Sequence, residues 1–304
     1  MLGNSITIIG GSGGLGQVFA KLFKRHGFEV TLMARSKAKL VRVANKLDVR
    51  YELNLEKSVS KADLIMISIP IHSTPAMIRK IGPMLKKDAL IFDVTSLKRE
   101  AYPALDEICR QHPINSLSLH PMFGPGIKNM RNYNMIFLEV GGTKYFSKKV
   151  NALRNLFQSE GLHITNVGDP EEHDKMMAIV LGAPHMINIL FIEFLQRIGI
   201  PLSKLMEFTG TTFLLQKIFA ESIIQREVEM FGEIQMDNPQ FHKIFRKFKE
   251  LVDDYSSIME TKNLERFKEI FSKGIQYSNE DPHFERSYEF FYKFMKILKQ
   301  NENE

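Results

Sequence analysis

The chain of 304 residues contains a single cysteine, Cys109, and therefore cannot form an internal disulfide. A lone thiol is typical of a reducing compartment, so we expect a cytoplasmic protein. Cys109 lies in an amphipathic helical pattern over residues 105–110, which favours a place in the core over a role as nucleophile. No secretory signal precedes the first expected strand, which begins at Ser5.

The sequence also lacks a strong excess of one charge. Its formal net charge is +6, from 41 Lys and Arg against 35 Asp and Glu. The densest basic run, residues 242–249, alternates with apolar residues at helical spacing, which predicts a solvated helix face. No nucleic-acid motif accompanies it, and we expect no nucleic-acid partner.

Residues 176–192 contain no Asp, Glu, Lys or Arg and approach the length of a membrane span. The same stretch contains Gly182, Pro184, His185 and Asn188. We therefore expect a helix buried on most sides by protein, and no membrane association. Because one small helical domain gives such a stretch little cover, it also predicts a homodimer joined through this half of the chain.

Two patterns divide the chain into expected domains at residues 1–168 and 169–304. In the first, β-rich runs alternate with amphipathic helical runs, which predicts a doubly wound α/β domain with a mostly parallel sheet. The expected strands are residues 5–9, 29–33, 64–69, 90–93, 116–119 and 135–140, and the expected helices are residues 15–26, 37–47, 74–84 and 100–112.

From Asp169 onward the pattern is helical nearly to the end. Asp169 followed by Pro170 and two glutamates is a strong helix start, because Asp caps the free amides and Pro suits the first turn. Breaks are expected near residues 199–201, 238–239 and 279–282. The second domain is therefore predicted to be all-helical.

A glycine-rich loop follows the first expected strand. Gly11, Gly13 and Gly16 match the G-x-G-x-x-G spacing of a Rossmann-type dinucleotide site. Gly11 would permit the turn, Gly13 the approach of a pyrophosphate, and Gly16 the close packing of the helix. The pyrophosphate would rest on the amides that open the helix. To the same cofactor site we assign Gly14, Leu15, Ser68 and Pro70.

The end of the second expected strand indicates which dinucleotide is bound. An NAD enzyme usually has an acidic residue there, which binds the ribose 2′-hydroxyl. This chain has Arg35, Ser36 and Lys37 instead. Cations and a hydroxyl suit a 2′-phosphate, so we predict NADP, with NAD as the alternative.

Candidate catalytic residues follow two other expected strands. One segment is residues 93–98, and the other is residues 118–125, which includes His120 before a Pro/Gly-rich turn. Ligands bind at the C-terminal ends of strands in such sheets, and a histidine is suited to accept a hydroxyl proton as hydride leaves. By itself, this pattern fits a buried structural histidine equally well.

Taken together, these segments resemble the prephenate/arogenate dehydrogenase family of tyrosine biosynthesis. The matching pieces occur in family order over residues 5–240, in both expected domains. They are the glycine loop and residues 93–98, 120–125, 171–174, 182–185 and 233–239.

The resemblance implies an oxidative decarboxylation in which hydride passes to NAD(P), carbon dioxide leaves and the ring becomes aromatic. It implies that His120 takes the proton from the ring hydroxyl, and that Ser96 hydrogen-bonds both His120 and that hydroxyl. It places His185 in the substrate pocket and implies a dimer formed through the helical domain.

The chain departs from the family at the residue that would bind a substrate carboxylate. Many relatives have an Arg on the helix that leads into residues 233–239, whereas here the helix carries Lys217, with Arg226 just beyond it. We choose Lys217 as the substrate-binding cation. Arg226, or an Arg from a partner subunit, is the alternative.

No metal site is predicted. His173 and His185 are twelve residues apart, which places them about 18 Å apart on a continuous helix, too far to share an ion. The sequence has no Cys pair and no H-E-x-x-H motif.

Two other functions fit parts of the pattern. One is another two-domain NADP oxidoreductase, of the 3-hydroxyacid dehydrogenase or deazaflavin-dependent NADP reductase type. A catalytic lysine of the former would have to be Lys175, and residues 120–125 would be unexplained. The other is a non-catalytic NADP-binding sensor, which would need the glycine loop but not both Ser96 and His120.

Overall fold

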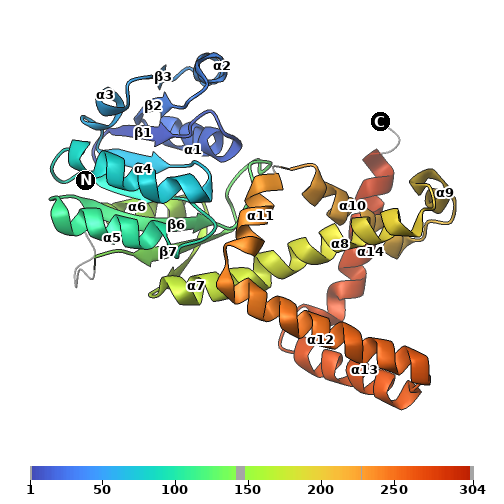
Figure 1. Ribbon diagram of the computed structural model, residues 1–304. Coiled ribbons are helices and arrows are strands. Elements are labelled where there is room, and N and C mark those ends of the chain that lie inside the picture. Colours follow the sequence, from blue (N-terminus) through green and yellow to red (C-terminus); the bar gives the residue numbers. More distant parts are fainter. Residues whose placement is uncertain (1, 142–147, 227, 302–304) are drawn as a thin grey trace. The chain divides into compact units, whose positions relative to one another are not determined.

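The computed structural model describes residues 2–141, 148–226 and 228–301. It divides into two compact units, drawn in Figure 1. Unit 1 comprises residues 1–178 together with Gly232–Asn238, and unit 2 comprises Ile179–Phe231 and Pro239–Glu304. Unit 1 thus contains the whole α/β region, and also a short segment that lies much later in the sequence.

Unit 1 is built on an eight-stranded sheet with the order β3-β2-β1-β4-β5-β6-β7-β8. Neighbouring strands are parallel except β6 and β7, which confirms the predicted α/β fold with a mostly parallel sheet. The strands are β1 (Ser5–Ile9), β2 (Glu29–Met33), β3 (Arg50–Tyr51), β4 (Leu64–Ile67), β5 (Leu90–Asp93), β6 (Asn115–Pro121), β7 (Asn134–Glu139) and β8 (His163–Val167).

Helices cover both faces of this sheet because its central strands are apolar on both sides. In β4, for example, Leu64 and Met66 belong to one hydrophobic cluster, and Ile65 and Ile67 to the other. The helices within residues 1–178 of unit 1 are α1 (Gly14–Arg25), α2 (Lys37–Leu47), α3 (Leu55–Val59), α4 (Thr74–Ile81), α5 (Ala101–Gln111), α6 (Lys148–Ser159) and α7 (Pro170–Met177).

The two clusters show which helices lie on which face. Residues of α1, α2 and α6 share one cluster, and residues of α3, α4 and α5 share the other. The strand order changes direction between β1 and β4, and in doubly wound sheets ligands bind at the C-terminal ends of the strands beside such a point. The glycine loop follows β1, and Ser68 follows β4.

The rest of the chain is helical, as predicted. Asp169 caps α7, and its side chain accepts a hydrogen bond from the Glu171 amide. All three expected breaks separate helices. The remaining helices are α8 (Ala183–Ile198), α9 (Leu202–Glu207), α10 (Thr211–Ile224), α11 (Val228–Met236), α12 (Pro239–Thr261), α13 (Leu264–Ser278) and α14 (Ser287–Asn301).

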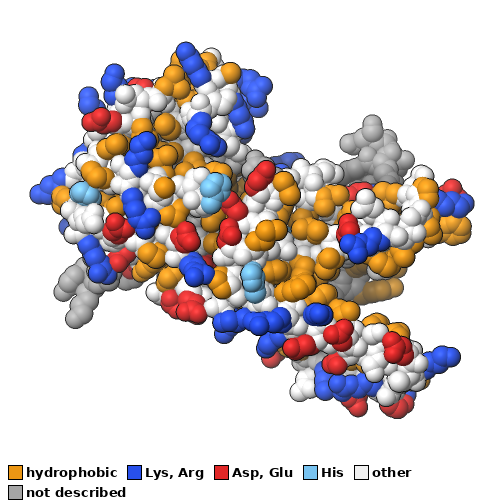
Figure 2. All heavy atoms as spheres, in the orientation of Figure 1, with side chains coloured by type: hydrophobic (Ala, Val, Ile, Leu, Met, Phe, Trp, Pro, Cys, Tyr) orange, Lys and Arg blue, Asp and Glu red, His pale blue; other side chains and the backbone are white. Residues whose placement is uncertain are grey.

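The expectation that residues 176–192 form a mostly buried helix is wrong for the single chain. The helical run Pro170–Ile198 is long and apolar enough to cross a membrane by length and composition alone, and only 17% of its most apolar window is buried. A π-helical turn at Ala178–Gly182 interrupts the run. Figure 2 shows hydrophobic side chains gathered over α8. The physical reason for the error is that a lack of charge shows only that burial of the helix would be favourable. Other residues of the same chain bury little of its surface.

Candidate functional site

The glycine loop between β1 and α1 forms a backbone cradle. Gly10 has φ +85°, and a Cβ there would lie 2.0 Å from the Ser68 carbonyl oxygen. A Cβ on Gly16 would lie 2.6 Å from the Gly10 carbonyl oxygen, so a glycine is needed where the helix meets the turn. Sequence reasoning assigned the tight turn to Gly11 and missed Gly10, because the positive φ and the contact with Ser68 depend on the fold.

The start of α1 is open to an anion. Gly13 occupies the N-cap position, where no side chain bonds the first amides of the helix. A Cβ on Gly14 would lie 2.8 Å from Cβ of Pro125, so the loop also lies against the turn that follows His120. Unbonded helix amides attract phosphate groups. The loop therefore fits the pyrophosphate of a dinucleotide, with Leu15 in the first turn of the helix.

The basic residues after β2 are exposed and available. Arg35, Ser36 and Lys37 all lie at the surface, and Ser36 caps α2 without a side-chain hydrogen bond. Neither cation forms an ion pair with any residue that the structure describes. Figure 2 shows Lys and Arg side chains gathered on the part of unit 1 that contains α2. This end of β2 can receive a phosphate.

Ser68 and Pro70 follow β4, which pairs with β1. The Ser68 amide donates a hydrogen bond to the Ile9 carbonyl oxygen (2.8 Å), and this bond holds the loop after β4 beside the glycine turn. Pro70 precedes a short 3₁₀ turn, Ile71–Ser73. The two residues thus border the same end of the sheet as the glycine loop.

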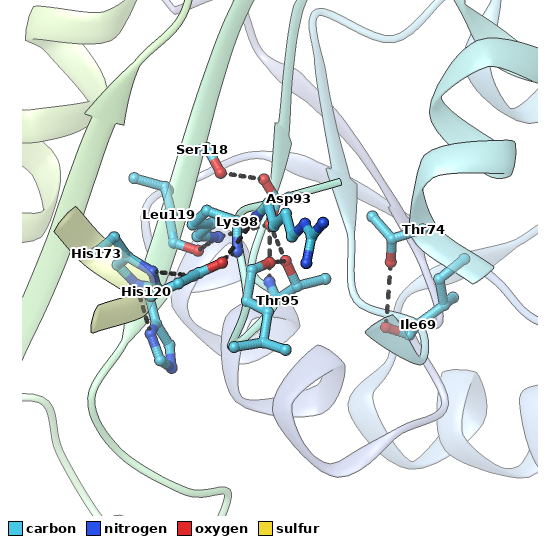
Figure 3. Close-up of polar contacts among 12 residues, drawn as sticks. Ile69, Thr74, Asp93, Thr95, Lys98, Ser118, Leu119, His120 and His173 are labelled. Carbon is cyan, nitrogen blue, oxygen red and sulfur yellow. Dashed lines mark hydrogen bonds and ion pairs between the residues drawn. The ribbon is translucent and has the colours of Figure 1, made fainter. Parts of the chain in front are cut away.

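His120 lies near the end of β6 and is 4% exposed. Its Nδ1 atom is 3.0 Å from Nε2 of His173, which lies on α7. Nδ1 of His173 is in turn 2.7 Å from Oδ1 of Asp174. Figure 3 shows the two rings side by side between β6 and α7. The structure therefore brings the predicted base into a buried row of Asp174, His173 and His120.

A second buried network supports the strand that carries His120. Nζ of Lys98 donates to Oδ2 of Asp93 (2.7 Å) and to the Leu119 carbonyl oxygen (2.6 Å), next to His120 in the chain. Asp93 also accepts hydrogen bonds from the hydroxyls of Thr95 and Ser118. These contacts are drawn in Figure 3. Residues 93–98 thus tie the ends of β5 and β6 together.

Burial keeps both histidines neutral at neutral pH. The pKa of His120 lies well below its ordinary value, because burial penalises the charged ring and His173 and Lys98 oppose a positive charge there. The pKa of His173 is also lowered, mainly by burial, although Asp174 acts in the opposite direction. A neutral histidine can accept a proton.

Ser96 lies half-buried in the loop after β5. Within the described part of the chain it forms no side-chain hydrogen bond, and His120 has His173 as its only partner. Among the described residues, the hydrogen bond between Ser96 and His120 that the family resemblance implied is thus not formed, and the role of Ser96 stays a prediction.

The two predicted substrate-binding residues lie in unit 2. His185, on α8, packs edge-on against the ring of Phe231 (4.7 Å between centroids). Its Nδ1 atom is buried without a hydrogen-bond partner among the described residues, and burial lowers its pKa. Lys217, on α10, is 2.7 Å from Oε2 of Glu221, so this cation already has an anionic partner.

Outside the gaps at 142–147, 227 and 302–304, no group of three His, Cys, Asp or Glu residues could hold a metal ion. The buried row at His120 contains two imidazoles and one carboxylate. That carboxylate already accepts the Lys98 and Arg99 amides, at 2.8 and 3.0 Å.

Two models of known protein families match most of the chain. Residues 19–164 match the nucleotide-binding domain of prephenate dehydrogenase, and residues 169–273 match its dimerization domain. The chain belongs to the prephenate dehydrogenase family. Unit 1 therefore contains the nucleotide-binding domain of a family of dehydrogenases, which agrees with the cradle that follows β1.

Two curated proteins are similar to this one over most of the chain. A probable arogenate/prephenate dehydrogenase of Methanocaldococcus jannaschii is 28% identical over 90% of this chain and 60% of the relative. The T-protein of Haemophilus influenzae is 24% identical over 89% of this chain and 66% of the relative. The chain thus spans about two thirds or less of the length of these relatives.

Solved structures of the prephenate dehydrogenase family share the fold. The prephenate dehydrogenase of A. aeolicus, solved with hydroxyphenyl propionate and NAD+, superposes with a TM-score of 0.72 at 19% identity. The superposition covers 90% of this chain and 98% of that chain. It confirms the Rossmann-type domain followed by a helical domain.

Sequence reasoning missed His173 and Asp174 as parts of the site. Both lie in a segment that carried the family resemblance, but no role followed from the pattern. The sequence feature that could have indicated them is a His-Asp pair in the first turns of a strongly predicted helix.

Proposed function

We propose that the protein is an NADP-dependent dehydrogenase of prephenate or arogenate, acting in the cytoplasm in tyrosine biosynthesis. The observation that carries this proposal is the buried, neutral His120 at the end of β6, in the same unit as the glycine cradle after β1. Family membership favours this reaction over those of 3-hydroxyacid dehydrogenases or deazaflavin-dependent reductases. The row at His120 argues against a sensor that only binds the cofactor.

In the proposed reaction, the ring carbon that bears the hydroxyl loses a hydride, and the bond to the ring carboxylate breaks. Carbon dioxide leaves, and the electron pair of that bond makes the ring aromatic. NADP, when bound, would supply the hydride acceptor. Nε2 of His120 takes the hydroxyl proton as the hydride departs and returns it to the phenolate oxygen. The products are 4-hydroxyphenylpyruvate from prephenate, or tyrosine from arogenate.

The cofactor would be held by the glycine loop and by the end of β2. Gly11, Gly13, Gly14, Leu15 and Gly16 would receive the pyrophosphate, and Ser68 and Pro70 would border it. Arg35, Ser36 and Lys37 would receive the 2′-phosphate, since both cations are exposed and no acidic residue lies at this strand end.

For the substrate we propose contacts from Ser96, His185 and Lys217. The unbonded Nδ1 of His185 supports a polar ligand at this position, because a buried polar atom without a partner is costly. Lys217 would bind a carboxylate as a point charge, with Arg226 as the alternative.

We also propose a homodimer joined through the helical half. Ile187, Leu190, Phe194 and Ile198 of α8 are 43–57% exposed in the single chain, and the matching family domain is a dimerization domain. Light scattering should give about twice the chain mass of 35.1 kDa. A monomer at micromolar concentration would contradict the assembly.

A direct assay tests the function. Prephenate and arogenate are offered side by side, each with NADP and with NAD, and the absorbance of the reduced cofactor is followed. We expect turnover of at least one substrate, faster with NADP. No turnover of either substrate with either cofactor would overturn the proposal.

A further inference from the structure

The carboxylate of Asp174 determines where the proton of His173 lies. Oδ1 accepts the Lys98 amide and Oδ2 accepts the Arg99 amide. Because backbone amides can only donate, both oxygens act as acceptors. Oδ1 also lies 2.7 Å from Nδ1 of His173. Nδ1 of His173 must therefore carry a proton and donate it to Asp174.

The proton on Nδ1 of His173 in turn determines where the proton of His120 lies. His173 is fully buried, and its pKa is lowered by burial, so the ring is neutral and carries only the Nδ1 proton. Its Nε2 atom then has a lone pair, 3.0 Å from Nδ1 of His120. Two lone pairs at this distance would repel each other. Nδ1 of His120 must therefore be protonated, and its Nε2 atom is left as the acceptor.

A charged His173 would give the opposite result. Its Nε2 atom would carry a proton and donate it to Nδ1 of His120, which would move the single proton of His120 onto Nε2. Such a ring could not take up a proton at Nε2. Burial of both rings and the nearby ammonium group of Lys98 disfavour this arrangement.

We propose that His173 and Asp174 are positioning residues that hold His120 in the tautomer whose Nε2 atom accepts a proton. This inference rests on the proposed dehydrogenase function, since it assigns the tautomer required by the base of that reaction. When His120 takes the hydroxyl proton, its Nδ1–H continues to donate to the lone pair of His173. The developing imidazolium thus keeps a hydrogen-bond acceptor in a buried place, as the base of a His-carboxylate pair does in other enzymes.

The experiment compares His173→Leu with His173→Gln in the full chain. Gln can offer a carbonyl oxygen to Nδ1 of His120, whereas Leu offers none. His163, an exposed residue of β8, supplies the matched control His163→Leu. The ring nitrogens of His120 are assigned by NMR with isotope-labelled histidine, because the shifts of protonated and unprotonated nitrogens differ. Turnover and the KM of the substrate are measured in parallel.

We expect the wild type and His163→Leu to show His120 protonated on Nδ1. In His173→Leu, the tautomer with a protonated Nε2 should become populated, and kcat should fall by about tenfold or more, as for impaired base catalysis, with KM little changed. His173→Gln should recover most of the wild-type tautomer and rate.

A wild-type His120 protonated on Nε2 would overturn the inference, and so would a His173→Leu variant with unchanged tautomer and kcat. The NMR result is independent of turnover. If the wild type oxidises neither substrate, the proposed function fails while the tautomer assignment can still be read. Should His173→Leu fail to fold, the wild-type tautomer and His173→Gln decide the matter.

Discussion

Nζ of Lys98 lies 2.7 Å from Oδ2 of Asp93, and neither side chain has any exposed surface. Removing one member of such a pair leaves the other charge buried and uncompensated. We therefore expect Lys98→Met to lower the free energy of unfolding by about 3–5 kcal/mol. Urea titration followed by circular dichroism measures the change.

A half-exposed ion pair in the same unit provides the control. Nε of Arg79 is 2.7 Å from Oε2 of Glu107, and the two side chains are 48% and 44% exposed. Arg79→Met should cost no more than about 1 kcal/mol. Equal losses for the two variants would mean that the buried pair contributes no more than the solvated one.

Replacing His120 tests the base directly. His120→Asn keeps a polar side chain but is shorter, and it removes the Nε2 nitrogen that accepts the proton. We expect kcat to fall by roughly 10²–10⁴, the usual scale of general-base loss, with cofactor affinity little changed. Steady-state kinetics and a cofactor titration measure the two quantities. Near-normal turnover would disprove the mechanism.

Arg35→Ala tests the cofactor assignment. Only NADP carries the 2′-phosphate, so the variant should bind NADP more weakly by roughly tenfold, about 1.4 kcal/mol, while NAD is unaffected. Fluorescence titration with the two cofactors gives both dissociation constants. Lys61→Ala, at an exposed position outside the loop after β2, is the control. A wild type that oxidises substrate faster with NAD would overturn the NADP assignment.

The buried histidines make stability depend on pH. The pKa values of His120, His173 and His185 are all lowered by burial in the folded state. The unfolded chain therefore binds protons first as the pH falls below about 6.5, and folding loses stability from there downward. We expect the Tm to be level above pH 7 and to fall between pH 6.5 and pH 5.

The carboxylate of Asp63 titrates in a separate, lower range. The pKa of Asp63 is lowered to about 2, with the Lys86 ammonium and the Asn4 amide among its hydrogen-bond partners, although burial opposes the shift. The contribution of Asp63 to the free energy of unfolding is lost only as the pH falls below about 4.

A Tm that stays constant from pH 7 to pH 5 would contradict the assignment of neutral buried histidines.

The ion pair of Lys217 with Glu221 allows substrate binding to be tested with two variants. If Lys217 binds a substrate carboxylate, Lys217→Ala should raise KM tenfold or more, about 1.4 kcal/mol. Glu221→Gln should then lower KM, because it releases the cation. An unchanged KM in both variants removes Lys217 from the site, and Arg226→Ala becomes the next variant to measure.

The sequence predicted those parts of the fold that depend on local patterns. Six strands were predicted within two residues, because their runs are apolar and β-branched. β3 was missed because it has only two residues, and β8 because its residues are mostly polar and part-exposed. The row at His120 could not be predicted, since it joins residues 53 positions apart through a single ring contact. Local sequence patterns do not show which distant residues come into contact.

The membership of Gly232–Asn238 in unit 1 has a consequence for dissecting the protein. Nδ2 of Asn238 donates to the Asp174 carbonyl oxygen (2.8 Å), and Glu233 accepts a hydrogen bond from the Ile71 amide (3.1 Å). A fragment ending at Ala178 would lose both hydrogen bonds, and the Asp174 carbonyl oxygen would keep only the bond from the Ala178 amide. A nucleotide-binding fragment cut at Ala178 would therefore lack contacts that come from a segment beginning more than fifty residues after α7 ends.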